Sequence, residues 1–139
     1  VVDDYAHHPR EVAATIAAAR GIVQTQAQQG RVLVVLQPHL FSRTRDFAGD
    51  FAAALDAADR AWVLPVYAAR EDPDPTVDAR TITSLATDTV TPLVEGEQLG
   101  ELITAHARPG DLLLMLGAGD IVEMTPALMA ALDQHGARG

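Results

Sequence analysis

The sequence lacks cysteine and lysine, and aromatic residues make up only 4% of its 139 residues. Without cysteine, neither a disulfide framework nor a thiolate metal site can form. Without lysine, the chain cannot supply a lysine base, a Schiff base or the lysine of a phosphate-binding P-loop. All ten basic residues are arginine, so guanidinium groups provide every permanent positive side-chain charge.

The chain also lacks an excess of positive charge and any long hydrophobic run. Its formal net charge is −9, from 19 acidic and 10 basic residues, whereas nucleic-acid-binding proteins concentrate positive charge. The longest apolar runs, at residues 32–36 and 112–116, are far shorter than the roughly 20 residues that span a bilayer. We therefore expect no nucleic-acid partner and no membrane span, and without a basic-then-apolar leader we expect a cytoplasmic location.

A chain of 139 residues has the length of one domain, and 48% apolar residues suffice for one buried core. We expect residues 1–139 to form a single domain. The sequence opens at Val1 without a methionine and passes at once from an apolar pair into a dense polar motif. We expect it to be a segment of a longer polypeptide.

Apolar stretches of strand length alternate with alanine-rich segments of helical period. Strands are predicted at residues 32–36, 62–66, 90–94 and 112–116, with the end of a fifth at residues 1–2. Helices are predicted at residues 9–20, 44–58, 97–107 and 120–135, and residues 76–86 form either a helix or a connection. Pro9 suits a first helical position, and Ser42 is predicted to cap the second helix. This alternation predicts an α/β fold, a Rossmann-like three-layer sandwich with a mostly parallel sheet of about five or six strands.

Polar or glycine-rich motifs follow three of the predicted strands. They occupy residues 3–9, 37–46 and 117–120. Because ligands collect at the carboxyl ends of parallel strands, all three motifs are expected to line one edge of the sheet.

The first motif reads Asp-Asp-Tyr-Ala-His-His-Pro and precedes a helix. A carboxylate at a strand end can accept hydrogen bonds from ribose hydroxyls, and imidazoles beside a helix N-terminus can meet phosphate. The structural alternative is that Asp3 or His8 caps the helix and Tyr5 packs in the core. A zinc site at His7 and His8 is disfavoured, because adjacent histidines on extended chain point in opposite directions.

The second motif places Arg43 and Arg45 at a predicted helix beginning, where the helix dipole disfavours positive charge. A guanidinium there is explained if it faces an anion, which it can hold with a two-pronged fork. The two side chains lie about 200° apart around a helix, so they cannot both face one pocket. The other arginine would then pair with Asp46 or Asp50. The third motif, Gly-Ala-Gly-Asp at residues 117–120, is half of a dinucleotide fingerprint and is weak evidence alone.

Taken together, these motifs resemble the C-terminal domain of the Mur ligases. The residues that carry the resemblance are 3–9, 37–39, 41–47, 66–71 and 117–121. The resemblance implies a three-domain, ATP-dependent ligase that phosphorylates a sugar-nucleotide carboxylate and lets an amino-acid amine attack the acyl phosphate. The segment at residues 42–47 favours the member that joins L-alanine to UDP-N-acetylmuramate. That reaction belongs to cytoplasmic peptidoglycan synthesis, and so to cell shape and cell division.

The resemblance also implies roles for individual residues. Asp4 would hold the ribose, and Tyr5 and His7 would line the nucleotide. The residues that would face the amino acid or the reacting phosphate, and so act in catalysis, are His8, His39 and Arg43. Further candidates for substrate binding are Arg45, Gly119 and Asp120. The P-loop, the Mg²⁺ ligands and the sugar-nucleotide site would belong to the other two domains, so this domain alone would be inactive.

One position departs from the family pattern. Many members carry arginine after the histidine of the second motif, whereas this chain has Leu40, which makes Arg43 the more important guanidinium. Two other hypotheses stay open on the sequence. The chain could be an independent nucleotide- or small-molecule-binding module of Rossmann-like type, or an acidic interaction domain without a ligand.

Overall fold

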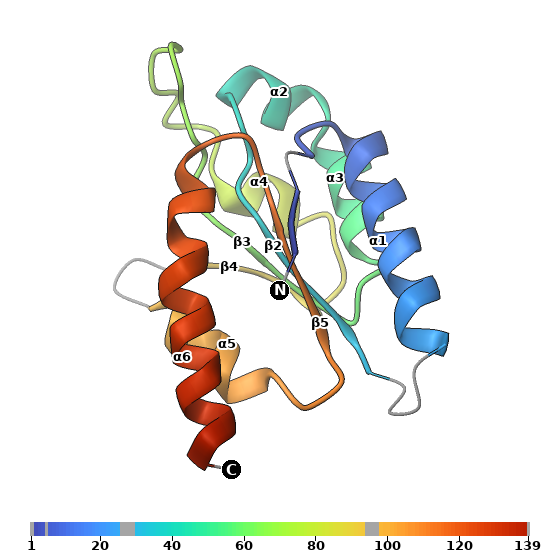
Figure 1. The fold of residues 1–139 in the computed structure, drawn as a ribbon. Coiled ribbons are helices and arrows are strands. Elements are labelled where there is room, and N and C mark those ends of the chain that lie inside the picture. Colours follow the sequence, from blue (N-terminus) through green and yellow to red (C-terminus); the bar gives the residue numbers. More distant parts are fainter. Residues whose placement is uncertain (1, 5, 26–29, 94–97, 139) are drawn as a thin grey trace.

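A five-stranded, fully parallel sheet forms the centre of the molecule (Figure 1). The computed structural model describes residues 2–4, 6–25, 30–93 and 98–138. The strands are β1 (Val2–Asp4), β2 (Val32–Leu36), β3 (Arg60–Val63), β4 (Val90–Pro92) and β5 (Leu112–Leu116). Their order across the sheet is β1-β5-β2-β3-β4, and every neighbouring pair is parallel. The predicted α/β architecture is confirmed.

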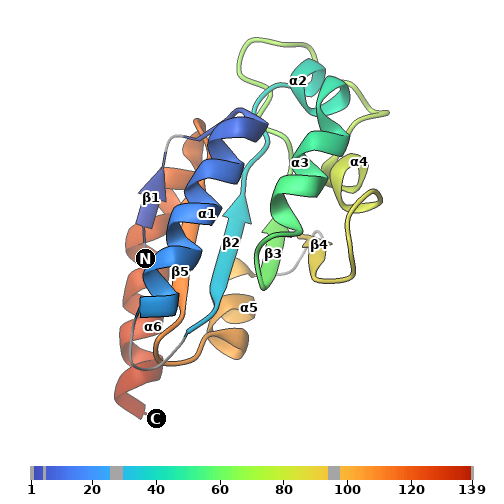
Figure 2. The same cartoon turned by 90° about the vertical axis from the view of Figure 1, so that its right-hand side faces the viewer.

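Helices cover both faces of this sheet (Figure 2). One face carries α1 (Pro9–Thr25), α3 (Ala48–Leu55) and α4 (Ala79–Thr83), and the other carries α5 (Leu99–His106) and α6 (Thr125–Arg138). The short helix α2 (Phe41–Asp46) lies beyond the end of β2, and the 3₁₀ helix η1 (Asp120–Met124) leads into α6. Among the described residues, no helix is long and apolar enough to cross a membrane.

The two apolar layers explain why the central strands read as unbroken hydrophobic runs. Along β2, Val32, Val34 and Leu36 pack against the α1 side, while Leu33 and Val35 pack against the α5 and α6 side. All five side chains are fully buried. Alternate side chains of a strand point to opposite faces, so a strand covered on both sides must be apolar at every position.

The strand predictions at residues 32–36 and 112–116 match β2 and β5. The strand predicted at residues 62–66 instead begins at Arg60 and ends at Val63, close to Pro65, which cannot donate a backbone hydrogen bond. The strand predicted at residues 90–94 ends at Pro92, and residue 94 lies outside the described residues. The first strand extends to Asp4.

The helix predicted at residues 44–58 is wrong in two ways. The segment forms two helices, α2 and α3, which are separated at Phe47 (φ −116°). The first of them begins at Phe41, so Ser42 lies inside it and is not its N-cap. The prediction at residues 120–135 is correct in place, although the segment starts as a 3₁₀ turn and continues to Arg138. Residues 79–83 of the uncertain segment form α4.

Candidate functional site

The three polar motifs meet at one edge of the sheet, beyond the carboxyl ends of β1, β5 and β2 (Figure 2). Asp4, Leu116 and Leu36 are in register across these strands. The chain stays tied together just past them, because the amide of Gly117 donates to the Asp4 carbonyl at 3.2 Å and that of Gln37 to the Leu116 carbonyl at 2.9 Å. The predicted clustering of the motifs is confirmed.

In the first motif, Asp4 organises the start of α1. One carboxylate oxygen accepts the backbone N–H of Ala6 at 3.1 Å, and the other accepts the Thr15 hydroxyl at 2.9 Å. Each oxygen of an ionised carboxylate keeps a further lone pair, so these bonds leave acceptor capacity for a ligand hydroxyl. Tyr5, predicted to lie near the nucleotide, falls outside the described residues.

The structural alternative for this motif was a helix cap by Asp3 or His8, and one of the two residues does cap α1. His8 caps α1, because its Nδ1 accepts the backbone N–H of Arg10 at 3.2 Å. Asp3 does not cap that helix, since its carboxylate accepts the Thr125 hydroxyl at 2.6 Å and so ties β1 to the start of α6.

Two histidines from different motifs face each other at the edge. The rings of His7 and His39 lie 6.2 Å apart, and His39 stacks on Tyr67 at 5.7 Å with an angle of 21° between the rings. The Nδ1 atom of His39 is buried and has no hydrogen-bond partner among the described residues. Burial lowers the pKa of His39, the neighbouring Arg43 and His7 side chains lower it further, and the Glu71 carboxylate opposes them. The imidazole is therefore held in its neutral, proton-accepting form.

The two arginines of the second motif occupy different surroundings. Arg43 is half-buried and acts electrostatically on His39. Arg45 is exposed and pairs with Asp46 at 3.1 Å. Between them, Thr44 is fully buried and donates to the Leu40 carbonyl at 2.8 Å.

The predicted conflict between these arginines and the helix dipole is not found. Helix α2 has only six residues, so Arg45 lies in its last turn, where positive charge is favourable, and Arg43 lies where the first and last turns overlap. The case for an anion site now rests on Arg43 itself. Among the described residues, no carboxylate forms an ion pair with it.

Sequence reasoning missed Glu71 as part of this edge. Its carboxylate accepts the backbone N–H of Ser42 at 3.1 Å and also the Ser42 hydroxyl. These bonds, with a further one from the Phe41 amide, lower the pKa of Glu71. The only available signal was the place of Glu71 within the segment at residues 66–71 that resembles the family.

The third motif is held by the second. The Gln37 side chain, only 6% exposed, donates to the Asp120 carboxylate at 2.5 Å and accepts the Ile121 backbone N–H at 3.1 Å. A Cβ atom on Gly119 would lie 2.5 Å from the Gln37 Oε1 and 2.6 Å from the Tyr67 Cγ. Packing within the domain therefore requires this glycine, which is a different reason from the ligand approach that its sequence suggests.

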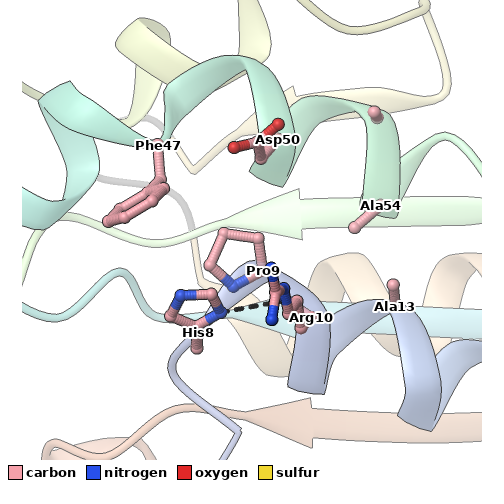
Figure 3. Close-up of a pocket in the computed structure, with 8 residues that line it drawn as sticks. His8, Pro9, Arg10, Ala13, Phe47, Asp50 and Ala54 are labelled. Carbon is pink, nitrogen blue, oxygen red and sulfur yellow. Dashed lines mark hydrogen bonds between the residues drawn. The ribbon is translucent and has the colours of Figure 1, made fainter.

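A groove of about 700 Å³ begins beside the first motif and runs between α1 and α3 (Figure 3). Its lining residues are His8, Pro9, Arg10, Ala13, Phe47, Asp50, Ala53 and Ala54. The His8 ring lies 5.2 Å from that of Phe47 at one end of the groove. Of the predicted site residues that the structure describes, the lining includes only His8, so the groove is not the point where the three motifs meet.

No three His, Asp or Glu side chains in the described part of the chain come together as a metal site.

Comparison with known proteins identifies the family. The family model described as "Mur ligase, glutamate ligase domain" matches residues 1–119, which include all three motifs up to Gly119. The chain belongs to the Mur ligase family. This Mur ligase domain is 48% identical over 132 residues to the UDP-N-acetylmuramate–L-alanine ligase of Mycobacterium ulcerans, and 47% identical over 137 residues to that of Thermobifida fusca. Each match covers 95% of this chain but only 27% and 29% of the relative.

Solved structures show the same fold. A domain from a putative UDP-N-acetylmuramate:L-alanyl-γ-D-glutamyl-meso-diaminopimelate ligase of Haemophilus ducreyi superposes with a TM-score of 0.67 at 25% identity, over 94% of this chain and 88% of that one. The UDP-N-acetylmuramate-alanine ligase of Thermotoga maritima superposes with a TM-score of 0.64 at 25% identity, over 95% of this chain and 26% of that one. The Mur ligase domain described here thus matches a domain-sized part of longer enzymes.

Proposed function

We propose that this chain is the C-terminal domain of an ATP-dependent ligase that joins L-alanine to UDP-N-acetylmuramate in cytoplasmic peptidoglycan synthesis. The observation that carries the proposal is the 48% identity to a ligase of that name over almost the whole chain. The structure supports it by gathering a carboxylate, two histidines and an arginine along one sheet edge, where α/β folds bind ligands.

The domain would supply one wall of the active site. It has no lysine for a P-loop, and its described residues form no cluster of metal ligands. The groups that cradle the ATP phosphates, hold Mg²⁺ and bind the sugar nucleotide would therefore come from the rest of the polypeptide. Closure of this domain over them would complete the site and exclude water.

Arg43 would bind the carboxylate of L-alanine. Alanine offers little else to grasp, because its methyl group is small and its amine must stay free to attack. A guanidinium can hold a carboxylate with two parallel hydrogen bonds, and Arg43 has no ion-pair partner among the described residues. Arg45 is a weaker candidate for substrate binding, since Asp46 already neutralises it.

His39 would assist the attack of the amine. Its lowered pKa keeps the imidazole neutral, and its buried Nδ1 has no partner in the described structure. Such a group can take the proton that the attacking alanine amine loses as the new C–N bond forms and the acyl–phosphate bond breaks. His8 keeps its proposed catalytic role from the family resemblance, although its Nδ1 already accepts the Arg10 amide.

The nucleotide would lie against the first motif. Asp4 would accept ribose hydroxyls with its remaining lone pairs, and His7 would line the nucleotide. Tyr5 keeps the same proposed role from the family resemblance. Gly119 and Asp120 stay proposed substrate contacts, held in place by Gln37.

The test is a ligation assay with the full-length polypeptide that contains this chain. Product mass and ADP release are measured with UDP-N-acetylmuramate, ATP, Mg²⁺ and L-alanine, and then with each omitted in turn. We expect product only when all are present, and none from residues 1–139 alone. Tight ATP binding by residues 1–139 alone, with no ligation by the full-length protein, would instead favour an independent nucleotide-binding module.

A further inference from the structure

The loop that follows β3 runs alongside the second motif at the top of the sheet (Figure 2). We call residues 65–71 the bracing loop. The Tyr67 amide donates to the Pro38 carbonyl at 2.8 Å, and the Tyr67 carbonyl accepts the Leu40 amide at 2.8 Å. These bonds form an isolated parallel bridge between His39 and Tyr67, beyond the last paired residues of β2 and β3.

The bracing loop also supplies the cap that α2 cannot make for itself. The N-cap position of α2 is Leu40, whose side chain has no oxygen to accept the first amides of the helix. Glu71 takes this role, since it accepts the Ser42 amide at 3.1 Å together with the Ser42 hydroxyl. A carboxylate is well suited to that place, because the first turn of a helix exposes N–H groups with no partner inside the helix.

One residue at the start of α2 and one in the bracing loop have unfavourable backbone conformations. Leu40 has φ 71° and Ala69 has φ 54°, in the left-handed region that side chains other than glycine, asparagine and aspartate rarely adopt. Such conformations persist where surrounding contacts impose them. Here those contacts are the two backbone bonds of Tyr67 and the carboxylate of Glu71.

We propose that Glu71 is a positioning residue that, through α2 and the bracing loop, holds Arg43 and His39 at the sites from which they would act on the amino acid. Arg43 lies one residue past the capped amide, on a helix of only six residues, so a loose first turn moves its guanidinium directly. His39 stacks on Tyr67 of the same loop. The inference rests on the proposed function, because it gives Glu71 a purpose in alanine binding beyond stability.

The test compares three variants of the full-length protein by steady-state kinetics, with alanine and ATP varied separately. Glu71→Ala removes the cap, and Glu71→Gln keeps its shape without its charge. The matched control is Asp78→Ala, which removes a carboxylate cap from α4, where the Asp78 side chain accepts the Arg80 amide at 2.8 Å. Both alanine variants lose a helix cap, but none of the predicted site residues lies on α4.

We expect Glu71→Ala to lower kcat/KM for alanine roughly tenfold or more, because misplacing a substrate-binding group by about 1 Å has effects of that size. The KM for ATP should change much less, Glu71→Gln should give a smaller defect, and Asp78→Ala should leave both KM values near wild type.

Amide hydrogen exchange of α2 separates failure of the inference from failure of the proposed function. Faster exchange at Ser42 in Glu71→Ala is expected whether or not the protein is a ligase. If the wild-type protein does not ligate alanine, the proposed function fails while this readout still tests the cap. The other case is a wild-type protein that does ligate alanine. If Glu71→Ala then shows faster exchange in α2 but keeps the wild-type KM and kcat for alanine, the positioning role is overturned. Unchanged exchange at Ser42 would overturn the cap itself.

Discussion

Replacing Gly119 with alanine tests whether the third motif is packed against the second as the structure shows. The added Cβ would meet the Gln37 Oε1 at 2.5 Å and the Tyr67 Cγ and Cδ1 at 2.6 and 2.9 Å. Ordinary contacts of such atoms lie near 3.5–4.0 Å, so both neighbours must move by about 1 Å. The Gln37 side chain does not move freely, because it bonds to Asp120 and Ile121. The backbone of Tyr67 is tied down by its bonds to residues 38 and 40.

Overpacking of this kind costs about 1–3 kcal/mol, so we expect Gly119→Ala to lower the free energy of unfolding by that amount. For a chain of this size the melting temperature should fall by roughly 3–12 °C. The assay is equilibrium urea unfolding of residues 1–139, whose sheet is covered on both faces within the chain.

The matched control is Gly21→Ala in the exposed interior of α1, where nothing lies within 4 Å of the added Cβ. Alanine is the better helix former there, so this variant should gain about 0.5–1 kcal/mol. The reasoning fails if Gly119→Ala unfolds at the wild-type urea concentration while Gly21→Ala shows its gain, because Gln37 and Tyr67 would then not be fixed against the glycine.

Two further predictions concern Asp4 and His39. In the full-length protein, Asp4→Ala should raise the KM for ATP about ten- to hundredfold, since a charge-assisted hydrogen bond contributes about 1.5–3 kcal/mol. The control is Thr15→Val, which removes only the hydroxyl that donates to Asp4 and should leave the KM for ATP nearly unchanged. Equal ATP defects in both variants would assign Asp4 a purely structural role. Because the pKa of His39 is lowered on folding, the unfolded chain binds the proton more readily, and stability should fall as the pH drops below about 6.5. Urea unfolding at several pH values should show a smaller fall in His39→Gln than in wild type, and equal falls would contradict the lowered pKa of His39 in the folded chain.

The parts of the fold that the sequence predicts well are those that depend on local pattern. Both β2 and β5 were placed correctly, because strands buried on two faces are apolar at every residue. The gathering of the three motifs also followed from the sequence, since parallel strands place their carboxyl ends at one edge.

The parts that were mispredicted depend on contacts between distant residues. Helix α2 begins at Phe41 because Glu71, 29 residues beyond Ser42, caps it, and no local signal marks that start. The role of Gly119 depends in the same way on Gln37 and Tyr67, which approach it only in the folded chain. A glycine-rich motif alone does not distinguish space for a ligand from space for the protein's own side chains.

The identity of the amino-acid anchor is the central claim, and the kinetics of Arg43→Lys and Arg45→Lys in the full-length protein test it most directly. Lysine keeps the charge but loses the two-pronged fork. Varying alanine and ATP separately, we predict that Arg43→Lys raises the KM for alanine and lowers kcat, with a smaller change in the KM for ATP. Arg45→Lys, whose guanidinium already pairs with Asp46, should do less. A larger alanine defect in Arg45→Lys than in Arg43→Lys would contradict the account.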